Sequence, residues 1–263
     1  MSTLSVIIIT KNEAHDIRAC LESVKWADEI IILDSGSTDN TVAICLEYTD
    51  KVFVTDWPGY GPQKNRALSY AIGDWVLSLD ADEQLSPALQ AEIKALLVGG
   101  KDFSSPPCGG KWPEGPEREC LAYSIPRLST YCGKIIRYGD WRKDYCRRLF
   151  RRGHAKFQDA QVHESLQVDG QLGRLSGHLL HATFKDLEEM LHKLNQFSSL
   201  SAKMRQHQGR NASVWTAILH GLWTFLRGYF LRLGFLDGRE GFVLAVSNAE
   251  GSYYRYLKLM YLE

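Results

Sequence analysis

The stretch Asp74-Trp75-Val76-Leu77-Ser78-Leu79-Asp80-Ala81-Asp82-Glu83 decides how this chain is interpreted, because an apolar strand runs directly into two carboxylates. In an extended chain residues i and i+2 lie on the same face, so we expect Asp80 and Asp82 to point toward one site. Mg²⁺ commonly takes one or two carboxylates together with substrate phosphates. A simple turn is the competing interpretation, since Asp is common where strands end. The surrounding pattern favours the metal site.

Apolar strand-like runs alternate with helical patterns over the first 98 residues. The predicted strands are Leu4–Thr10, Glu29–Asp34, Lys51–Val54 and the stretch quoted above, and the predicted helices lie at 17–24, 42–46, 63–71 and 86–97. We expect Thr38 or Asp39 to cap the second helix and Ser86 to cap the fourth, with Pro87 at its first position. This alternation predicts an α/β fold whose parallel sheet is covered by helices on both faces.

Polar side chains follow three of these strands. In parallel sheets, ligands bind at the carboxyl ends of the strands. The residues at those ends are Thr10, Asn12 and Glu13, then Asp34, Ser37 and Asp39, and finally Asp80 and Asp82. The first strand is not followed by the glycine-rich motif of dinucleotide-binding proteins, and the phosphate-loop motif is also absent. We therefore expect a nucleotide that is held by side chains and a metal ion.

The composition is that of an ordinary globular protein, with 44% hydrophobic and 24% charged residues in 263. Lys+Arg and Asp+Glu are balanced at 31 each, which argues against a nucleic-acid-binding protein. Residues 140–156 are nevertheless rich in basic side chains. The six cysteines form no Cys-x-x-Cys pair, so zinc is disfavoured and free thiols are expected. The N-terminus lacks the pattern of a signal peptide, and we expect a cytoplasmic location.

Residues 213–236 are strongly apolar within a C-terminal region that is helical from Asp186 onward. Arg232 lies away from the helical face on which the other polar residues of this segment gather. The residues of that face are Ser213, Thr216, His220, Thr224 and Arg227. The segment is long enough to span a bilayer, but two arginines and the polar stripe argue against a span. We expect an interfacial amphipathic helix. A buried helix or a contact between subunits is the alternative.

Together these motifs resemble the inverting family 2 glycosyltransferases, which have the GT-A fold. The matching segments are Ser5–Glu13, Glu29–Thr41, Gln63–Leu68, Asp74–Glu83, Tyr138–Arg152, Val162–Glu164 and Gly234–Gly241. Within this family the chain looks most like the β-1,4-glucosyltransferases that add glucose to the inner core of bacterial lipopolysaccharide. The resemblance implies a catalytic domain over 1–185, with a nucleotide-sugar-binding part at 1–98, a variable loop at 99–119 and an acceptor-binding part at 120–185. Residues 186–263 then form a helical, membrane-associating extension.

The resemblance also assigns donor-site roles. Asp80 and Asp82 match the motif that binds a metal and the donor diphosphate, and Mg²⁺ or Mn²⁺ is expected there with Asp82 in direct contact. His181 is a candidate metal ligand, with His163 as its alternative, although a structural role is the commoner one for an isolated histidine. The residues expected to frame the nucleoside are Thr10, Asn12, Glu13, Asp34 and Asp39. For Asp34 and Asp39 helix capping is the alternative, and Glu13 is also compatible with a favourable acid in a helix's first turn.

Other residues are expected to contact the diphosphate or the acceptor. Lys64 and Arg66 are candidates for the diphosphate or sugar, with a solvated helix face as the alternative. Arg142 and Arg148, in the basic stretch, suit an anionic acceptor, because arginine pairs bidentately with carboxylates and phosphates. The same stretch can instead be a solvated surface or attract anionic lipid headgroups.

An inverting transfer needs a carboxylate that takes the proton of the acceptor hydroxyl. Glu164 is the candidate general base, and Asp159 and Asp144 are the alternatives.

We therefore predict a metal-dependent inverting glycosyltransferase that moves glucose from UDP-glucose onto the lipopolysaccharide inner core. It is expected to be peripheral on the inner face of the cytoplasmic membrane, to bind no nucleic acid, and to form homo-oligomers, if any, through its C-terminal helices. The alternatives are a GT-A enzyme acting on a polyprenyl phosphate or a capsule glycan, a nucleotidyltransferase, and a non-catalytic GT-A scaffold. The nucleotidyltransferase is disfavoured because Ile9-Thr10-Lys11-Asn12 lacks a glycine-rich first loop.

Overall fold

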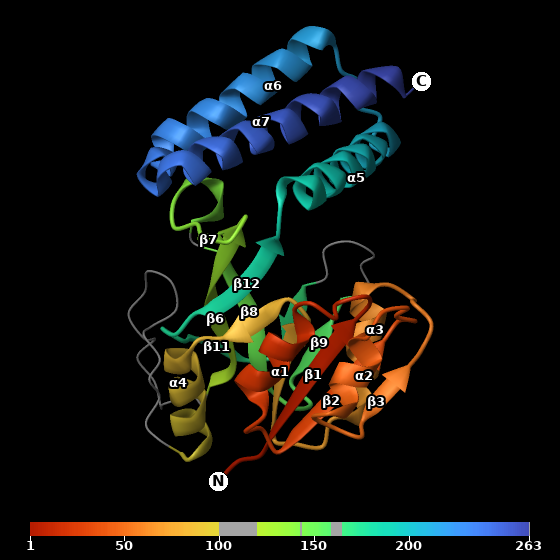
Figure 1. The fold of residues 1–263 in the computed structure, drawn as a ribbon, viewed down its shortest axis with the longest axis vertical. Helices are drawn as coiled ribbons and strands as arrows, with labels where there is room; N and C mark the ends of the chain where they lie inside the picture. The colour runs from red at the N-terminus through yellow and green to blue at the C-terminus, as the bar shows by residue number, and fades with distance from the viewer. Residues whose placement is uncertain (100–119, 143, 159–164, 263) are drawn as a thin grey trace. The chain divides into compact units, whose positions relative to one another are not determined.

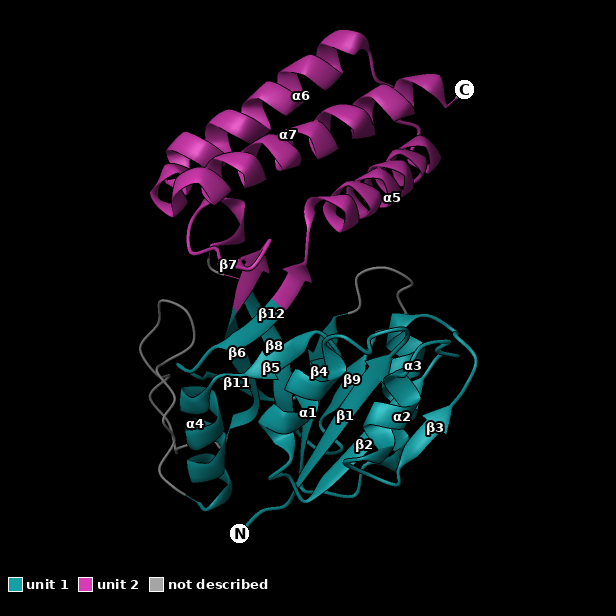
Figure 2. Cartoon of the chain, in the orientation of Figure 1, with its two compact units in different colours: residues 1–127, 145–181 teal, residues 128–144, 182–263 magenta. Residues whose placement is uncertain are grey.

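The computed structural model describes residues 1–99, 120–142, 144–158 and 165–262 and divides the chain into two compact units. Unit 1 comprises residues 1–127 and 145–181, and unit 2 comprises residues 128–144 and 182–263 (Figure 2). Residues 128–144 and 182–185 therefore belong to unit 2, whereas the sequence analysis grouped them with the catalytic domain. Glu164, Asp159, His163 and nearly all of the predicted variable loop lie outside the described residues.

Unit 1 is an α/β structure (Figure 1). Its helices are α1 (Ile17–Val24), α2 (Thr41–Leu46), α3 (Tyr60–Tyr70) and α4 (Pro87–Leu97). Its strands are β1 (Leu4–Thr10), β2 (Glu29–Asp34), β3 (Val52–Val54), β4 (Trp75–Asp80), β5 (Glu83–Leu85), β6 (Cys120–Tyr131), β8 (Asp144–Arg151), β9 (Ala155–Phe157), β10 (Leu166–Val168), β11 (Gln171–Arg174) and β12 (Leu179–Phe184). The unit boundaries fall within β6, at the start of β8 and within β12.

The strands follow the order β3-β2-β1-β4-β8-β6-β12-β5 in one sheet. The pairs β1–β2, β1–β4 and β2–β3 are parallel, as the sequence predicted. β8 pairs with β4 in the antiparallel sense, and so does β12 with β5, which makes the complete sheet mixed. Thr10 lies opposite Asp34 in the β1–β2 register, so two of the predicted polar groups meet at one edge.

The parallel strands are apolar throughout because both faces of the sheet are covered. In β1, Val6 and Ile8 pack with residues of α1, α2 and α4, whereas Ile7 and Ile9 pack with α3 and the β9–β10 pair. β2 alternates in the same way. A strand of this kind cannot slip by one residue without exchanging its two faces. The sheet edge that carries the polar groups is thus held in register by the core.

The predicted helix starts are partly confirmed. The Ser86 side chain accepts a hydrogen bond from the Leu89 N–H at the start of α4, as expected. At α2 the cap residue is Asn40, and Asp39 acts one position earlier by accepting from the N–H of Thr41 at 3.0 Å. α3 begins three residues before the predicted Gln63. Its Pro62 lies in the first turn, where proline leaves no intrahelical hydrogen bond unmade.

Unit 2 is mainly helical. Its elements are β7 (Lys134–Ile135), the 3₁₀ turn η1 (Gly139–Trp141), α5 (Leu187–His207), α6 (Val214–Leu226), the π-helical turn η2 (Arg227–Leu231), the 3₁₀ turn η3 (Gly234–Asp237) and α7 (Gly238–Tyr261). α6 and α7 lie side by side (Figure 1). Segment 213–236 is not one continuous helix, because α6 ends in η2 and Leu233 then takes a left-handed conformation with φ +60°.

Apolar side chains of α6 face solvent. The exposed fractions are 72% for Trp215, 63% for Leu219 and 54% for Leu222. Ser213 and Thr216, two members of the predicted polar stripe, form a capping box at the start of α6. Within the described residues, no helix combines the length and the apolarity that crossing a bilayer requires.

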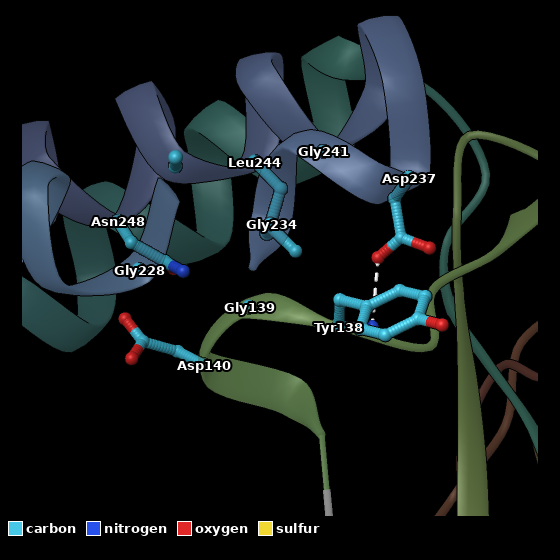
Figure 3. Close-up of a pocket in the computed structure, with 10 residues that line it drawn as sticks. Tyr138, Gly139, Asp140, Gly228, Gly234, Asp237, Gly241, Leu244 and Asn248 are labelled. Atoms are coloured by element: carbon cyan, nitrogen blue, oxygen red, sulfur yellow. Dashed lines mark hydrogen bonds between the residues drawn. The ribbon is translucent and has the colours of Figure 1, made fainter. Parts of the chain in front are cut away.

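Four glycines bring η1, η2, η3 and the start of α7 together; they are Gly139, Gly228, Gly234 and Gly241 (Figure 3). The cavity between them has a volume of about 10 Å³, which is the space of a single water molecule. Asp237 fixes the neighbouring loop by accepting from the N–H groups of Arg137 at 3.2 Å and Tyr138 at 2.8 Å. The Gly234–Gly241 segment of the resemblance therefore makes a packing junction and not a ligand pocket.

Substitution of Gly241 tests this junction. A Cβ at Gly241 would lie 2.0 Å from the carbonyl oxygen of Gly234, whereas a Cβ at Gly251, on the same helix, would lie at an ordinary 3.6 Å from Leu194. We expect Gly241→Ala to lower the free energy of unfolding by roughly 2 kcal/mol through overpacking. Gly251→Ala should leave it unchanged or raise it by up to about 1 kcal/mol, because alanine is the better helix former. Urea denaturation followed by circular dichroism measures both, and equal effects would contradict the packing argument.

Candidate active site

β4 ends at Asp80, and Ala81 and Asp82 form a turn before β5 begins at Glu83. The expectation that Asp80 and Asp82 share a face of an extended chain is therefore wrong, because the backbone turns between them. Asp80 contacts basic side chains, whereas Asp82 contacts His181. The two carboxylates have different partners, and they are suited to different tasks.

Asp80 is held by two cations. Lys64, which is 1% exposed, places Nζ 2.8 Å from one carboxylate oxygen, and Arg148 donates to the other. Burial opposes ionisation of Asp80, but Arg148 and Lys64 outweigh it and hold its pKa well below the ordinary value. Both of its oxygens are thereby engaged, so Asp80 acts first as a structural anion.

Glu83 is the buried partner that the sequence analysis missed. Its exposed fraction is 0%, and its Oε1 accepts from Arg148 at 2.7 Å and from Arg127 at 3.2 Å. Its Oε2 accepts from the Asp80 N–H at 3.1 Å, which closes the turn. The available signals were the position of Glu83 directly after Asp82 and the lone Arg127 in an apolar strand. We call Lys64, Asp80, Glu83, Arg127 and Arg148 the charge cluster.

Asp82 and His181 lie beside the charge cluster. The Asp82 Oδ2 is 3.1 Å from the His181 Nε2, and β12 brings this histidine into register with Glu83 of β5. In the described parts of the chain, no group of three or more His, Cys, Asp or Glu side chains is arranged for a metal ion. A hard cation that takes most of its ligands from phosphate and water needs only one or two protein groups, and Asp82 with His181 fits that requirement. Asp80 fits it less well, because a metal contact would compete with its ion pairs.

Asn12 joins the loops that follow β1 and β2, and Asp34 shapes the second of these loops. The Asp34 carboxylate is 1% exposed and accepts from the N–H groups of Gly36 at 2.9 Å and Ser37 at 2.8 Å. Asn12, with φ +56°, accepts from the Thr38 N–H at 2.8 Å. The structure thus brings both predicted nucleoside residues together, and it uses their side chains to shape the loops.

Thr10, Glu13 and Asp39 lie at the same edge. The Thr10 hydroxyl is buried and has no hydrogen-bond partner among the described residues. Glu13 precedes α1, so the alternative of an acid in that helix's first turn is wrong, and its N–H donates to the Thr41 hydroxyl at 2.8 Å. The exposed Asp39 accepts from the Ala14 N–H at 3.2 Å. This rim of two linked loops is preorganised, with Asn12 and Asp39 at its surface.

The structure separates the two basic candidates of α3. Lys64 joins the charge cluster, whereas Arg66 pairs with Asp56 at 2.8 Å on the surface. Gln63, which was not singled out, is fully buried and donates to the hydroxyls of Ser35 at 3.2 Å and Thr55 at 2.8 Å. It therefore anchors α3 to the second loop.

The predicted acceptor residues are divided between the units. Arg148 lies in unit 1 within the charge cluster, where its arginine fork binds protein carboxylates. Arg142 and Asp144 lie in unit 2, where Arg142 is exposed and Asp144 is half-buried. Glu164 and Asp159 fall outside the described residues, so their assignment as candidate base remains a prediction.

Residues 5–153 match the family model described as glycosyl transferase family 2. The chain belongs to glycosyltransferase family 2. The match covers β1 to β8 with the loops that follow β1, β2 and β4, so the family and the GT-A-like fold predicted from the sequence are confirmed.

The relatives include an uncharacterized glycosyltransferase, RP128, of Rickettsia prowazekii, which is 34% identical over 98% of this chain and 87% of its own length. The lipopolysaccharide core biosynthesis glycosyltransferase LpsC of Rhizobium meliloti is 30% identical over 94% of this chain and 87% of its own length. Among solved structures, glucosyl-3-phosphoglycerate synthase from Mycobacterium tuberculosis is 23% identical, with a TM-score of 0.34 over 49% of this chain and 44% of that chain. That structural likeness is too partial to carry an inference, but the relatives establish a glycosyltransferase.

Two neighbouring residues of α3 test the charge cluster. Lys64 is buried, and its removal leaves Asp80 with only one of its two cations, so Lys64→Met should lower the free energy of unfolding by roughly 3 kcal/mol. Arg66→Met breaks an ion pair whose Asp56 is 76% exposed, and it should cost less than about 1 kcal/mol. Chemical denaturation of both variants gives the comparison. If the two variants lost similar amounts of unfolding free energy, the ion pair of Lys64 would contribute no more to stability than the surface pair of Arg66.

Acid unfolding tests Asp80. A carboxylate whose pKa is depressed by folding contributes stability that is complete above its ordinary pKa of about 3.9 and is lost as the pH falls further. Between pH 5 and pH 2 the wild type should therefore lose stability more steeply than Asp80→Asn, by at most about 1.4 kcal/mol per pH unit. Asp56→Asn, which alters a surface ion pair, is the control and should keep the wild-type slope. Parallel profiles for wild type and Asp80→Asn would refute the assignment.

Proposed function

We propose that the chain transfers glucose from UDP-glucose to the inner core of lipopolysaccharide, with inversion and with help from a divalent metal ion. Membership of glycosyltransferase family 2 supplies the reaction class. The name of the relative LpsC supports an acceptor in the lipopolysaccharide core. The choice of donor sugar rests on the sequence resemblance alone.

The observation that carries this proposal is the position of Asp82. It stands in the turn after a central parallel strand, where ligands of such sheets bind, and its carboxylate is 22% exposed. The fully buried Glu83 and the paired Asp80 hold that turn on both sides. A carboxylate that is fixed in place and still reachable from solvent is what binding of a metal–diphosphate group requires.

The donor is expected to lie along the carboxyl edge of β1, β2 and β4. The two linked loops, with Asn12 and Asp39 at their surface, offer polar groups for the base and ribose. Asp82 and His181 would hold Mg²⁺ or Mn²⁺, which neutralises charge that develops on the leaving diphosphate. Arg148 and Lys64 keep Asp80 ionised, because they hold its pKa well below the ordinary value.

The transfer itself is a single displacement. The acceptor hydroxyl oxygen forms a bond to the anomeric carbon while the bond from that carbon to UDP breaks, and a carboxylate takes the hydroxyl proton. Glu164 is our candidate for that carboxylate, on the basis of its place in the Val-His-Glu motif. Attack from the face opposite the departing UDP inverts the anomeric configuration.

A lipid-linked acceptor calls for access to a membrane surface. The solvent-facing Trp215, Leu219 and Leu222 of α6 support peripheral binding to the inner face of the cytoplasmic membrane. The exposed basic residues between 140 and 156 support attraction to acidic groups of either the acceptor or the lipid; they are Arg142, Arg147, Arg152 and Lys156.

Donor turnover is the decisive measurement. The protein is given UDP-glucose, UDP-galactose, UDP-N-acetylglucosamine, GDP-mannose or ADP-heptose, with lipopolysaccharide from core-truncated strains and with Mn²⁺ or EDTA, and release of nucleoside diphosphate is followed. We expect release from UDP-glucose that depends on acceptor and is abolished by EDTA. Asp82→Asn should lower the rate at least roughly 100-fold, in line with the loss of one charge-stabilising group.

Asp56→Asn is the matched control, because it removes a carboxylate from the same unit without touching the turn. It should retain wild-type turnover. Release that persists in EDTA would refute the metal dependence, and turnover of another donor alone would refute the choice of glucose.

A further inference from the structure

Unit 2 contains a pocket of about 480 Å³ whose lining comes from η1, α5, α6, η2 and α7. Its lining includes four arginines, Arg205, Arg227, Arg232 and Arg255, but only one carboxylate, Asp140. The volume lies in the range of small-molecule sites. All of the lining residues belong to unit 2, so the pocket is complete within that unit.

Asp140 compensates two of the four arginines. Its Oδ2 lies 3.2 Å from Arg227 and its Oδ1 lies 2.5 Å from Arg232. Arg205 and Arg255 form no ion pair with any described residue. Arg205 lies over the Tyr256 ring at 4.9 Å, and that ring stacks on His220 at 4.1 Å, which gives this wall of the pocket a fixed shape.

Two guanidinium N–H donors in the pocket are unsatisfied. The Nε atoms of Arg227 and Arg255 are buried and have no acceptor among the described residues. Burial, and then the nearby Arg205, lower the pKa of Arg255, yet a guanidinium remains protonated at physiological pH. An N–H donor that is buried without an acceptor is costly, and the part-buried Arg255 has no carboxylate partner among the described residues, so an anion that pairs with its guanidinium would lower this cost.

An oxyanion of phosphate type fits these groups best. Arginine forks bind phosphate oxygens through paired, charge-assisted hydrogen bonds. The polar side chains of Asn248 and Ser252 complete the lining between the arginines. A carboxylate offers fewer acceptor oxygens to so many donors.

The surroundings of the pocket indicate where the phosphate comes from. The residues His220, Trp223 and Thr224 of α6 and Arg227 at the start of η2 line the pocket. Trp215, Leu219, Leu222 and Leu226 occupy the adjoining arc of the helix at 100° per residue, and each is exposed. A soluble phosphate compound would leave this apolar arc in water. A membrane lipid offers a phosphate for the pocket and an apolar interface for the arc.

We propose that the pocket binds the phosphate of an anionic membrane lipid, with Arg205 and Arg255 as its principal ligands and the apolar arc of α6 set into the membrane interface. This deepens the membrane association proposed above and does not depend on the transfer reaction. The lipid phosphate would hold unit 2 in one orientation on the surface, which an apolar face alone does not do.

Vesicle binding tests the proposal. Affinity is measured for vesicles of phosphatidylcholine with and without phosphatidic acid, using the fluorescence of Trp141 and Trp223, which line the pocket. The double variant Arg205→Gln/Arg255→Gln should bind phosphatidic acid vesicles about 100-fold more weakly, since each charge-assisted hydrogen bond is worth at least about tenfold. The matched control is Lys203→Gln/Arg239→Gln, which removes two exposed charges from the same two helices. Its affinity should fall by less than that of the pocket variant and by at most roughly 30-fold, because each exposed charge contributes about 1 kcal/mol through the surface potential.

Each contrary outcome has a distinct meaning. Equal losses in the two double variants would overturn the pocket in favour of general charge attraction. Wild-type binding to phosphatidylcholine vesicles that is as tight as binding to phosphatidic acid vesicles would overturn the pocket and leave apolar membrane association standing. Glycerol phosphate in solution that binds as tightly as the vesicles would overturn the lipid source. The pocket variant should melt no lower than the wild type, because it loses unpaired charges, and the assay contains no nucleotide sugar, so the proposed transfer reaction is not at stake.

Discussion

Burial of the Glu83 carboxylate is the constraint on which the candidate active site depends. A charge with no exposure to solvent is tolerated only with partners, and here Arg148 and Arg127 provide them. Because Arg148 also binds Asp80, it ties Asp80 to Glu83 across the turn between them. The charge cluster thus fixes the backbone of the turn that carries Asp82.

The first four strands could be read from the sequence because a strand buried on both faces is apolar throughout, as β1 and β2 are. Ser86-Pro87 marked a helix start for an equally local reason. The turn at Ala81–Asp82 could not be read in this way, since an extended chain and a turn carry the same residues. Nor could periodicity tell that Lys64 is buried against Asp80 while Arg66 pairs with the exposed Asp56, because this depends on how α3 packs on β1, β2 and β9.

Unit 2 shows the same division between local and distant information. The apolar character of α6 was evident from the sequence, and so was part of the polar stripe that lines the arginine pocket, namely His220, Thr224 and Arg227. Arg205 and Arg255 come from other helices, and no spacing rule connects them with that stripe. Ser213 and Thr216 were assigned to the polar stripe because of their helical angle. In the structure they form the capping box at the start of α6. The sequence pattern therefore predicted one wall of the pocket but not the charges of Arg205 and Arg255.

The charge cluster also has a consequence for the order of folding. Arg148 lies 68 positions from Asp80, and Arg127 lies 44 positions from Glu83, so the cluster closes only after long stretches of chain have been brought together. Contacts of such separation form slowly, because the loop entropy is lost before the contact is gained. The polar edge of β1 and β2 can assemble during synthesis, whereas the acidic turn closes only after β8 has been made. A nascent chain that ends before β8 lacks Arg148, and its Glu83 must remain hydrated or become protonated until that strand arrives.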